Sequence, residues 1–167
     1  MPTHSSSRWF SLSFGSKLYG TALLKNITGH GRENDQPSRV TDILIEVKGA
    51  SSVTVQDCVF WSTALSIINV DNLIIEHTDF YDLVWKFSKH MTYKKGIAVT
   101  DVDNVLITYN TFKTWSAYTH VDALSSILFN SVGTQILVQH NTFDYFDCEA
   151  DNRANRSCVA FNYLSFE

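Results

Sequence analysis

A nine-residue stretch, Ser52-Val-Thr-Val-Gln-Asp-Cys-Val-Phe60, decides the fold, because the same pattern recurs three more times along the chain. The other copies are residues 72–80, 104–112 and 135–143, and each of them also ends in Phe. Two positions are apolar in every copy; they are occupied by Val53, Leu73, Val105 and Ile136, and by Val55, Ile75, Ile107 and Val138. Alternation with a period of two predicts a strand that turns one face inward.

The remainder of each repeat is also built from short strands. The residues after the alternating stretch suit a tight turn or a side-chain ladder, and they are Cys58, Thr78, Asn110 and Asn141. Another apolar segment precedes each copy, at residues 43–47, 65–69, 97–101 and 124–129, and turn-like residues join the two. Each unit is therefore predicted to run strand, turn, strand, corner and short Phe strand. Helical periodicity and helix caps are missing, which favours an all-β chain.

Two all-β folds compete for this pattern. A β-sandwich has regular short strands but does not require the same residue class at equivalent positions of every repeat. Stacked coils do require it, because like side chains lie over one another in the core. We therefore predict a parallel β-helix solenoid of about five short coils.

The segments VTVQDCVF, ending at Phe60, and VLITYNTF, ending at Phe112, resemble the coil signature of the pectin-lyase-like superfamily. The resemblance covers residues 40–146 and implies a right-handed parallel β-helix. That superfamily includes lyases, hydrolases, phage tailspikes and inert scaffolds, so the resemblance is specific for the fold and leaves the activity open.

The chain is expected to form one domain. Residues 1–17 are interpreted as an N-terminal extension or cap, and residues 18–167 as the β-helix, with a degenerate coil at 18–29 and a last strand at 159–166. Insertions follow the Phe column at residues 81–95, 113–121 and 144–157. In a coil stack these insertions emerge along one edge, so we expect them to form one rim.

This rim is the predicted ligand site. It combines cations, which pair with carboxylates, and rings, which pack on sugar faces, and this combination suits an acidic polysaccharide. The expected ligand-binding residues are Lys86, Lys89, Lys95, Trp115, Tyr118 and His120. The alternative is a set of solvated loops whose rings cover the end of the core.

Catalysis has weaker support in the sequence. Asp122-Ala-Leu124 and Asp42-Ile43 resemble the "DAI"-like element of the calcium site in pectate lyases, but the coils between them supply no cluster of carboxylates. Lys95, Asp122 and Arg153 are the nominal catalytic candidates for a lyase. Inverting hydrolysis would need two facing carboxylates, and none is identified. We therefore expect no cofactor, no metal site and no established catalytic set; calcium has no support beyond the resemblance.

The histidines of the corner have a structural interpretation. His77 and His140 share one repeat position with Asp57 and Tyr109. Because four residue types occupy that position, we expect local hydrogen bonds at the corner rather than a shared catalytic role.

Charge and hydropathy exclude other classes of protein. The chain has 13 Lys+Arg and 17 Asp+Glu, a net charge of -4, which argues against nucleic acid as a partner. No apolar run has the length of about 18 residues that a membrane span requires. The N-terminus shows no signal peptide, so the location stays open. The small number of coils and the missing signal peptide fit a component of an extracellular or virion assembly better than a cytoplasmic protein. Of the three cysteines, Cys148 and Cys158 flank a polar loop and are either a disulfide or reduced thiols.

One outward column predicts a protein interface. It reads Thr54, Ile74, Leu106 and Leu137, and stacking at about 4.8 Å would join the last three side chains into an apolar strip. A soluble monomer seldom leaves such a strip in water. A second subunit or a neighbouring protein is the expected cover, and the alternative is the chain's own N-terminal segment, with Trp9, Phe10, Leu12 and Phe14.

These features together predict a non-catalytic β-helix scaffold or carbohydrate-binding module in a larger extracellular or virion assembly. The alternative is a polysaccharide lyase or glycoside hydrolase that acts on an acidic polysaccharide.

Overall fold

The computed structural model describes residues 9–14, 20–30, 43–61, 63–81, 97–114, 123–145 and 155–162. Within these ranges every regular element is a β-strand, and every strand pairing is parallel, which confirms the all-β prediction. The described part of the chain contains no helix with the length and apolar character needed to cross a membrane.

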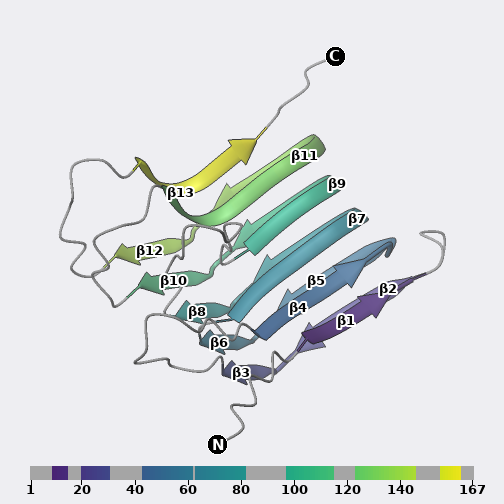
Figure 1. Ribbon diagram of the computed structural model, residues 1–167, viewed down its shortest axis with the longest axis horizontal. Helices are drawn as coiled ribbons and strands as arrows, with labels where there is room; N and C mark the ends of the chain where they lie inside the picture. Colours follow the sequence, from purple (N-terminus) through teal and green to yellow (C-terminus); the bar gives the residue numbers. More distant parts are fainter. Residues whose placement is uncertain are drawn as a thin grey trace, which may run out of the picture.

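The longer strands form one 8-stranded sheet, whose main path runs β1-β4-β7-β9-β11-β13 (Figure 1). β2 and β5 lie off this path, and β5 joins β2 to β7. The bounds are β1 (Trp9–Ser13), β2 (Thr21–Lys25), β4 (Ile43–Lys48), β5 (Ser52–Gln56), β7 (Thr63–Glu76), β9 (Ile97–Thr108), β11 (Ala123–Gln139) and β13 (Asn155–Asn162).

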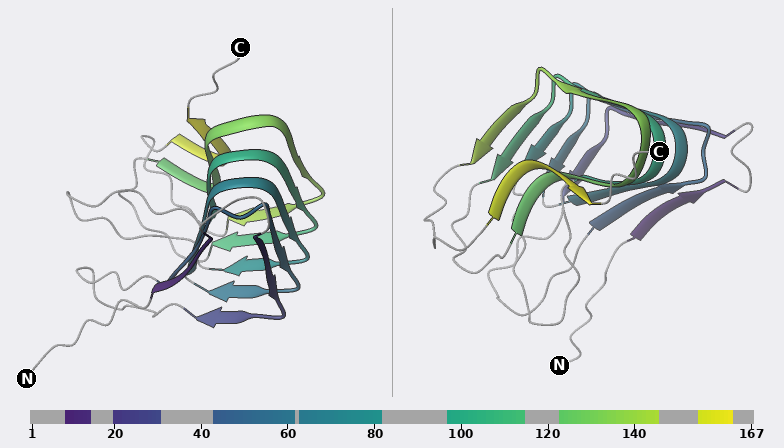
Figure 2. Two further views of the ribbon diagram at one scale, coloured as in Figure 1. Left: turned by 90° about the vertical axis from the view of Figure 1, so that its right-hand side faces the viewer. Right: turned by 90° about the horizontal axis from the view of Figure 1, so that it is seen from above.

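The strands that carry the Phe residues form a separate 5-stranded sheet in the order β12-β10-β8-β6-β3. They are β3 (Thr28–His30), β6 (Val59–Trp61), β8 (Asp79–Tyr81), β10 (Thr111–Thr114) and β12 (Thr142–Tyr145). Figure 2 shows the bent strands β7, β9 and β11 lying over one another, with the chain then turning into the short sheet. The five repeats are β1–β3, β4–β6, β7–β8, β9–β10 and β11–β12, so the degenerate copy expected at residues 18–29 joins the stack.

The predicted inward columns are in register. Val53 pairs with Leu73, Leu73 with Val105 and Val105 with Ile136. The Phe column is aligned in the same way, as Phe60, Phe80, Phe112 and Phe143. Their ring centroids lie 5.5, 4.9 and 4.8 Å apart in chain order, and this ring stack forms one wall of the core.

The turns predicted at 70–72 and 102–104 do not interrupt the long sheet. β7, β9 and β11 are single bent strands in which the ladder continues through the pairs of Val102 with Val70 and Val132. In β7 and β9 the bends coincide with single residues of positive φ, Asn69 at 56° and Asp101 at 53°. One left-handed residue redirects the chain without removing the neighbouring strand pairs, which is why the turn appears as a bend.

Several predicted segments are only partly described. Residues 9–13, within the predicted N-terminal extension or cap, form β1 and pair with β4. The insertions predicted at 81–95, 113–121 and 144–157 begin at the ends of β8, β10 and β12, and most of their residues lie outside the described ranges.

Candidate functional site

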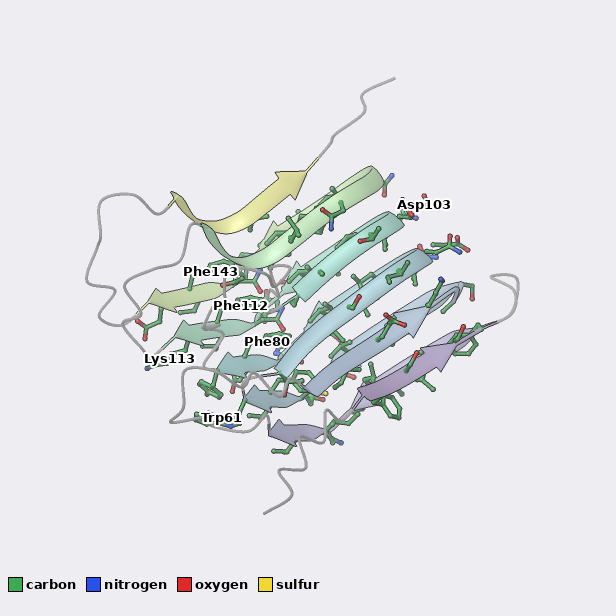
Figure 3. The ribbon with its side chains drawn as sticks, viewed as in Figure 1. Trp61, Phe80, Asp103, Phe112, Lys113 and Phe143 are labelled. Atoms are coloured by element: carbon green, nitrogen blue, oxygen red, sulfur yellow. The ribbon has the colours of Figure 1, made fainter. Side chains whose placement is uncertain are left out.

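The outward face of the short sheet carries an aromatic pair. Trp61 on β6 and Tyr81 on β8 each follow the inward-facing Phe of their repeat, so their side chains point away from the core. The rings are half-buried and stacked, with centroids 4.4 Å apart and planes inclined by 27°. Figure 3 shows Trp61 and Lys113 at the same end of the molecule, far from Asp103.

Charged groups continue this column. The hydroxyl of Tyr81 donates a hydrogen bond of 3.2 Å to Oδ2 of Asp79 on the same strand. In the next two repeats, Nζ of Lys113 lies 3.1 Å from Oδ2 of Asp144. The outward face therefore presents two rings beside two carboxylates and one ammonium group. We call Trp61, Asp79, Tyr81, Lys113 and Asp144 the short-sheet face.

The hydroxyl of Tyr81 is held in its neutral form. Burial raises the pKa of Tyr81, and the negative charge of Asp79 and the hydrogen bond to it raise that pKa further. The phenol is therefore a hydrogen-bond donor throughout the neutral pH range.

The predicted rim residues cannot be placed against this face. Lys86, Lys89, Lys95, Trp115, Tyr118 and His120 lie outside the described residues, and so do the catalytic candidates Asp122 and Arg153. Sequence reasoning named neither Trp61 nor Tyr81 as a site residue, although each directly follows the Phe of its repeat and Tyr81 begins the insertion predicted at 81–95.

The corner before the short sheet is a hydrogen-bonded ladder, as predicted. Asn110 is 2% exposed; its Oδ1 accepts the N–H of Thr78 at 2.9 Å, and its Nδ2 donates to the carbonyl of Ile75 at 2.9 Å. Asn141 repeats both bonds one repeat later, to the N–H of Asn110 at 2.9 Å and the carbonyl of Ile107 at 2.8 Å. The ladder satisfies backbone groups that the change of direction removes from the strands.

The residue immediately before this ladder adopts a left-handed conformation in all five repeats: Asn26, Asp57, His77, Tyr109 and His140 have φ between 49° and 55°. The expected local hydrogen bonds of the two histidines give way to ring stacking. Tyr109 lies between them, with centroids 5.3 Å from His77 and 5.1 Å from His140. The rings stack because equal backbone conformations project equivalent side chains in the same direction.

The three residues of the predicted apolar strip on the long sheet, Ile74, Leu106 and Leu137, are in register, and Leu23 lies in the same column beyond Thr54. Leu23 pairs with Thr54, and the column continues through Ile74 and Leu106 to Leu137. Leu23 is 63% exposed and Leu137 49%, while Ile74 and Leu106 are half-buried. We call this column the aliphatic ladder.

The chain's N-terminal strand does not cover the aliphatic ladder. Residues 9–13 pair with β4 at the far side of the bend, and Leu12 and Phe14 pack against the core. Phe10 is itself 49% exposed. The alternative considered from the sequence, in which the N-terminal segment covers the aliphatic ladder, is therefore wrong for residues 9–14.

Among the described residues, no group of three or more His, Cys, Asp or Glu residues could hold a metal ion. Cys58 is a buried free thiol whose Sγ donates to the carbonyl of Gln56, and burial raises its pKa. Cys148 lies outside the described residues, and only the backbone of Cys158 is described, in β13.

Comparison of the chain with protein-family models, with curated proteins and with solved structures finds no match in any of the three.

Proposed function

We propose that this chain is a right-handed parallel β-helix module, of the pectin-lyase-like kind, that binds a glycan without catalysis as part of a larger extracellular or virion assembly. The fold half of the proposal is supported by parallel repeats in register, with like residues over like in the Phe column and in the corner ladder. Such ladders are typical of stacked repeats, in which each unit contacts only its neighbours.

The observation that carries the binding function is the stacked pair of Trp61 and Tyr81 beside Asp79, Lys113 and Asp144. Ring surface accommodates the apolar C–H groups of a sugar, and nearby carboxylates and hydroxyls accept or donate hydrogen bonds to its hydroxyl groups. The ammonium group of Lys113 adds an attraction for a sugar carboxylate.

The insertions support this location of the glycan site, and they supply the positive charge that an acidic ligand requires. β8 and β10 lead directly into the segments that hold Lys86, Lys89, Lys95, Trp115, Tyr118 and His120. These residues would add rings and three lysine ammonium groups to a face whose own charges are two carboxylates and one ammonium group. The added positive charge makes an acidic polysaccharide the expected ligand class.

Binding of a panel of acidic oligosaccharides, measured by isothermal titration calorimetry, tests the proposal. We expect Trp61→Ala to weaken binding by about tenfold, which corresponds to about 1.4 kcal/mol. Tyr109→Ala is the matched control, because it removes an exposed ring of the corner and leaves the short-sheet face intact. Equal affinity of the Trp61 and Tyr109 variants would contradict the assignment of the site.

The same oligosaccharides separate a binding module from an enzyme. A binding module leaves them intact, whereas a lyase releases products with an unsaturated end and a hydrolase releases new reducing ends. Sustained release of either product by the purified chain would replace the proposal with the enzymatic alternative.

The aliphatic ladder supports the assembly half of the proposal. Its two ends, Leu23 and Leu137, are among the most exposed large apolar side chains of the described residues. Contact with a second subunit or a neighbouring protein would remove this surface from water.

A further inference from the structure

The fifth repeat has an edge that the described part of the chain covers only in part. β13 pairs with the first half of β11, from Ala123 to Asn130. The second half of β11, residues 135–139, pairs only with β9 among the described strands, and β12 pairs only with β10. Two consecutive strand segments, joined by the corner at His140 and Asn141, thus present one unpaired side each within the described structure.

The core is correspondingly thin at this edge. Val105, Ile107 and Phe112 of the fourth repeat are buried, with exposures of 4%, 0% and 0%. Their partners in the fifth repeat, Ile136, Val138 and Phe143, are half-buried, although they occupy the same inward columns. A further strand laid over the fifth repeat would bury these three side chains as the fifth repeat buries those of the fourth.

The corner ladder shows which hydrogen-bonding group a strand added at this edge would have to supply. Each corner N–H donates to the side-chain oxygen of the following repeat: Cys58 to Oγ1 of Thr78 at 3.3 Å, Thr78 to Oδ1 of Asn110, and Asn110 to Oδ1 of Asn141. Asn141 is the last corner residue among the described residues, and its N–H has no acceptor within the described part of the chain.

Two carbonyl groups at this edge extend the same pattern. The side chains of Asn110 and Asn141 donate to the carbonyls of Ile75 and Ile107, and Val138 is the next residue of that column. Thr142 donates its N–H to the carbonyl of Asn110, so the carbonyl of Asn141 is the next acceptor in that series. One donor and two acceptors are therefore placed to receive a strand with a specified corner residue.

We propose that the edge formed by residues 135–145 binds an extended segment of a partner polypeptide, which adds a parallel strand to both sheets. The segment has apolar residues at alternate positions, Asn at the corner and an aromatic residue two positions after that Asn. The Asn satisfies the donor of Asn141 and the carbonyl of Val138, and the aromatic ring continues the stack beyond Phe143. Addition of a strand to an open sheet edge is an established mode of peptide recognition, in which backbone bonds supply affinity and alternate side chains supply specificity.

A second copy of this chain fits the edge less well. At the other end of the stack, the strands of the first repeat that correspond to residues 135–145 are β2 and β3, and each has one open side among the described residues. At the corner that repeat carries Ile27, which has no side-chain acceptor, and at the aromatic position it carries Gly29. The chemistry of the edge therefore favours a segment of another polypeptide over the first repeat of a second copy.

This inference does not depend on glycan binding. It concerns the end of the stack rather than the outward short-sheet face, and its test contains no carbohydrate. Failure of the peptide experiment would leave the glycan titration unaffected, and the reverse also holds.

The test uses the full chain and a synthetic peptide with the sequence of residues 104–114, NVLITYNTFKT, which carries the required pattern. Fluorescence anisotropy of the labelled peptide measures affinity, and hydrogen exchange locates the bound strand. We expect saturable binding and slower exchange at residues 135–145, with no change at residues 52–60. The matched control peptide, with Ala in place of the residue equivalent to Asn110, is expected to bind about tenfold more weakly, because it leaves the partners of that Asn unpaired.

Three results would overturn the proposal. The first is absence of saturable binding, and the second is equal affinity of the two peptides, which would remove the role of the corner Asn. The third is concentration-dependent end-to-end association of the chain alone by light scattering, with protection of residues 135–145 in the associated form, which would make a second copy the occupant. Because the control change is made in the peptide, the fold of the chain is the same in every measurement.

Discussion

Replacement of Asn110 by Ala should destabilise the protein more than any exposed Asn replacement. Asn110 is 2% exposed, and its side chain holds two backbone groups of the previous repeat, the N–H of Thr78 and the carbonyl of Ile75. Both neighbours are fully buried, so water does not readily replace the lost partners.

The size of the effect follows from these two groups. Leaving one buried polar group without a partner costs about 1–3 kcal/mol, so two such groups cost about 2–6 kcal/mol together. Because the free energy of unfolding of a small domain is about 5–15 kcal/mol in total, the variant would lose a large share of its stability. Asn110→Thr should lose roughly half as much, because Thr78 shows that a hydroxyl at this corner accepts the preceding N–H.

Equilibrium unfolding in urea, followed by far-UV circular dichroism, measures these differences provided that the denaturant dependence is unchanged. The matched control is Asn72→Ala, an exposed residue whose side chain donates to the carbonyl of Ser51 at 3.3 Å. We expect the control to change the unfolding free energy by no more than about 0.5 kcal/mol. A loss below about 1 kcal/mol for Asn110→Ala, or a loss equal to that of the control, would refute the ladder argument.

Three further predictions concern the core, the buried thiol and the aliphatic ladder. Phe112→Ala should cost about 3–5 kcal/mol in urea unfolding because its ring is fully buried between two others, whereas Phe143→Ala at the half-buried end should cost less; equal losses would contradict the packing. Because the folded-state pKa of Cys58 is raised above its ordinary 9.0, the unfolding free energy should fall as pH rises through and beyond that value. The pH dependence should be weaker in Cys58→Val, and identical slopes in urea titrations would refute the assignment. The double variant Leu106→Ser, Leu137→Ser should be a smaller species than the wild type by light scattering, and it should keep a cooperative thermal unfolding transition. A monomeric wild type whose double variant is unfolded would indicate that another part of the chain covers the aliphatic ladder.

Much of the fold could be predicted because its signals are local and repeated. Alternating residues such as Val53 and Val55 show which face of a strand is buried, and equivalent residues in the next copy show that the strands stack in register. The corner ladder of Thr78, Asn110 and Asn141 could be anticipated for the same reason, since its members recur at one position of the repeat.

The candidate site was harder to predict because it depends on the outward residues, whose identity changes from repeat to repeat. Sequence reasoning looked for function in the insertions and named neither Trp61, which lies inside a repeat, nor Tyr81, the first residue of the insertion predicted at 81–95. A residue that varies within a repeat carries no periodic signal, and only its distance from the next repeat shows what it contacts.

The amino-acid sequence by itself determined the strands, the inward columns and the parallel order of the repeats, because side-chain alternation and recurrence are properties of the chain alone. Only the tertiary structure decided that the predicted turns are bends within continuous strands, that Tyr109 lies stacked between His77 and His140, and that β13 leaves residues 135–139 without a second strand neighbour in the described structure. These features depend on the backbone conformation at single corner residues and on how far one strand extends over another. Both are decided by contacts between repeats that lie about thirty residues apart in the sequence.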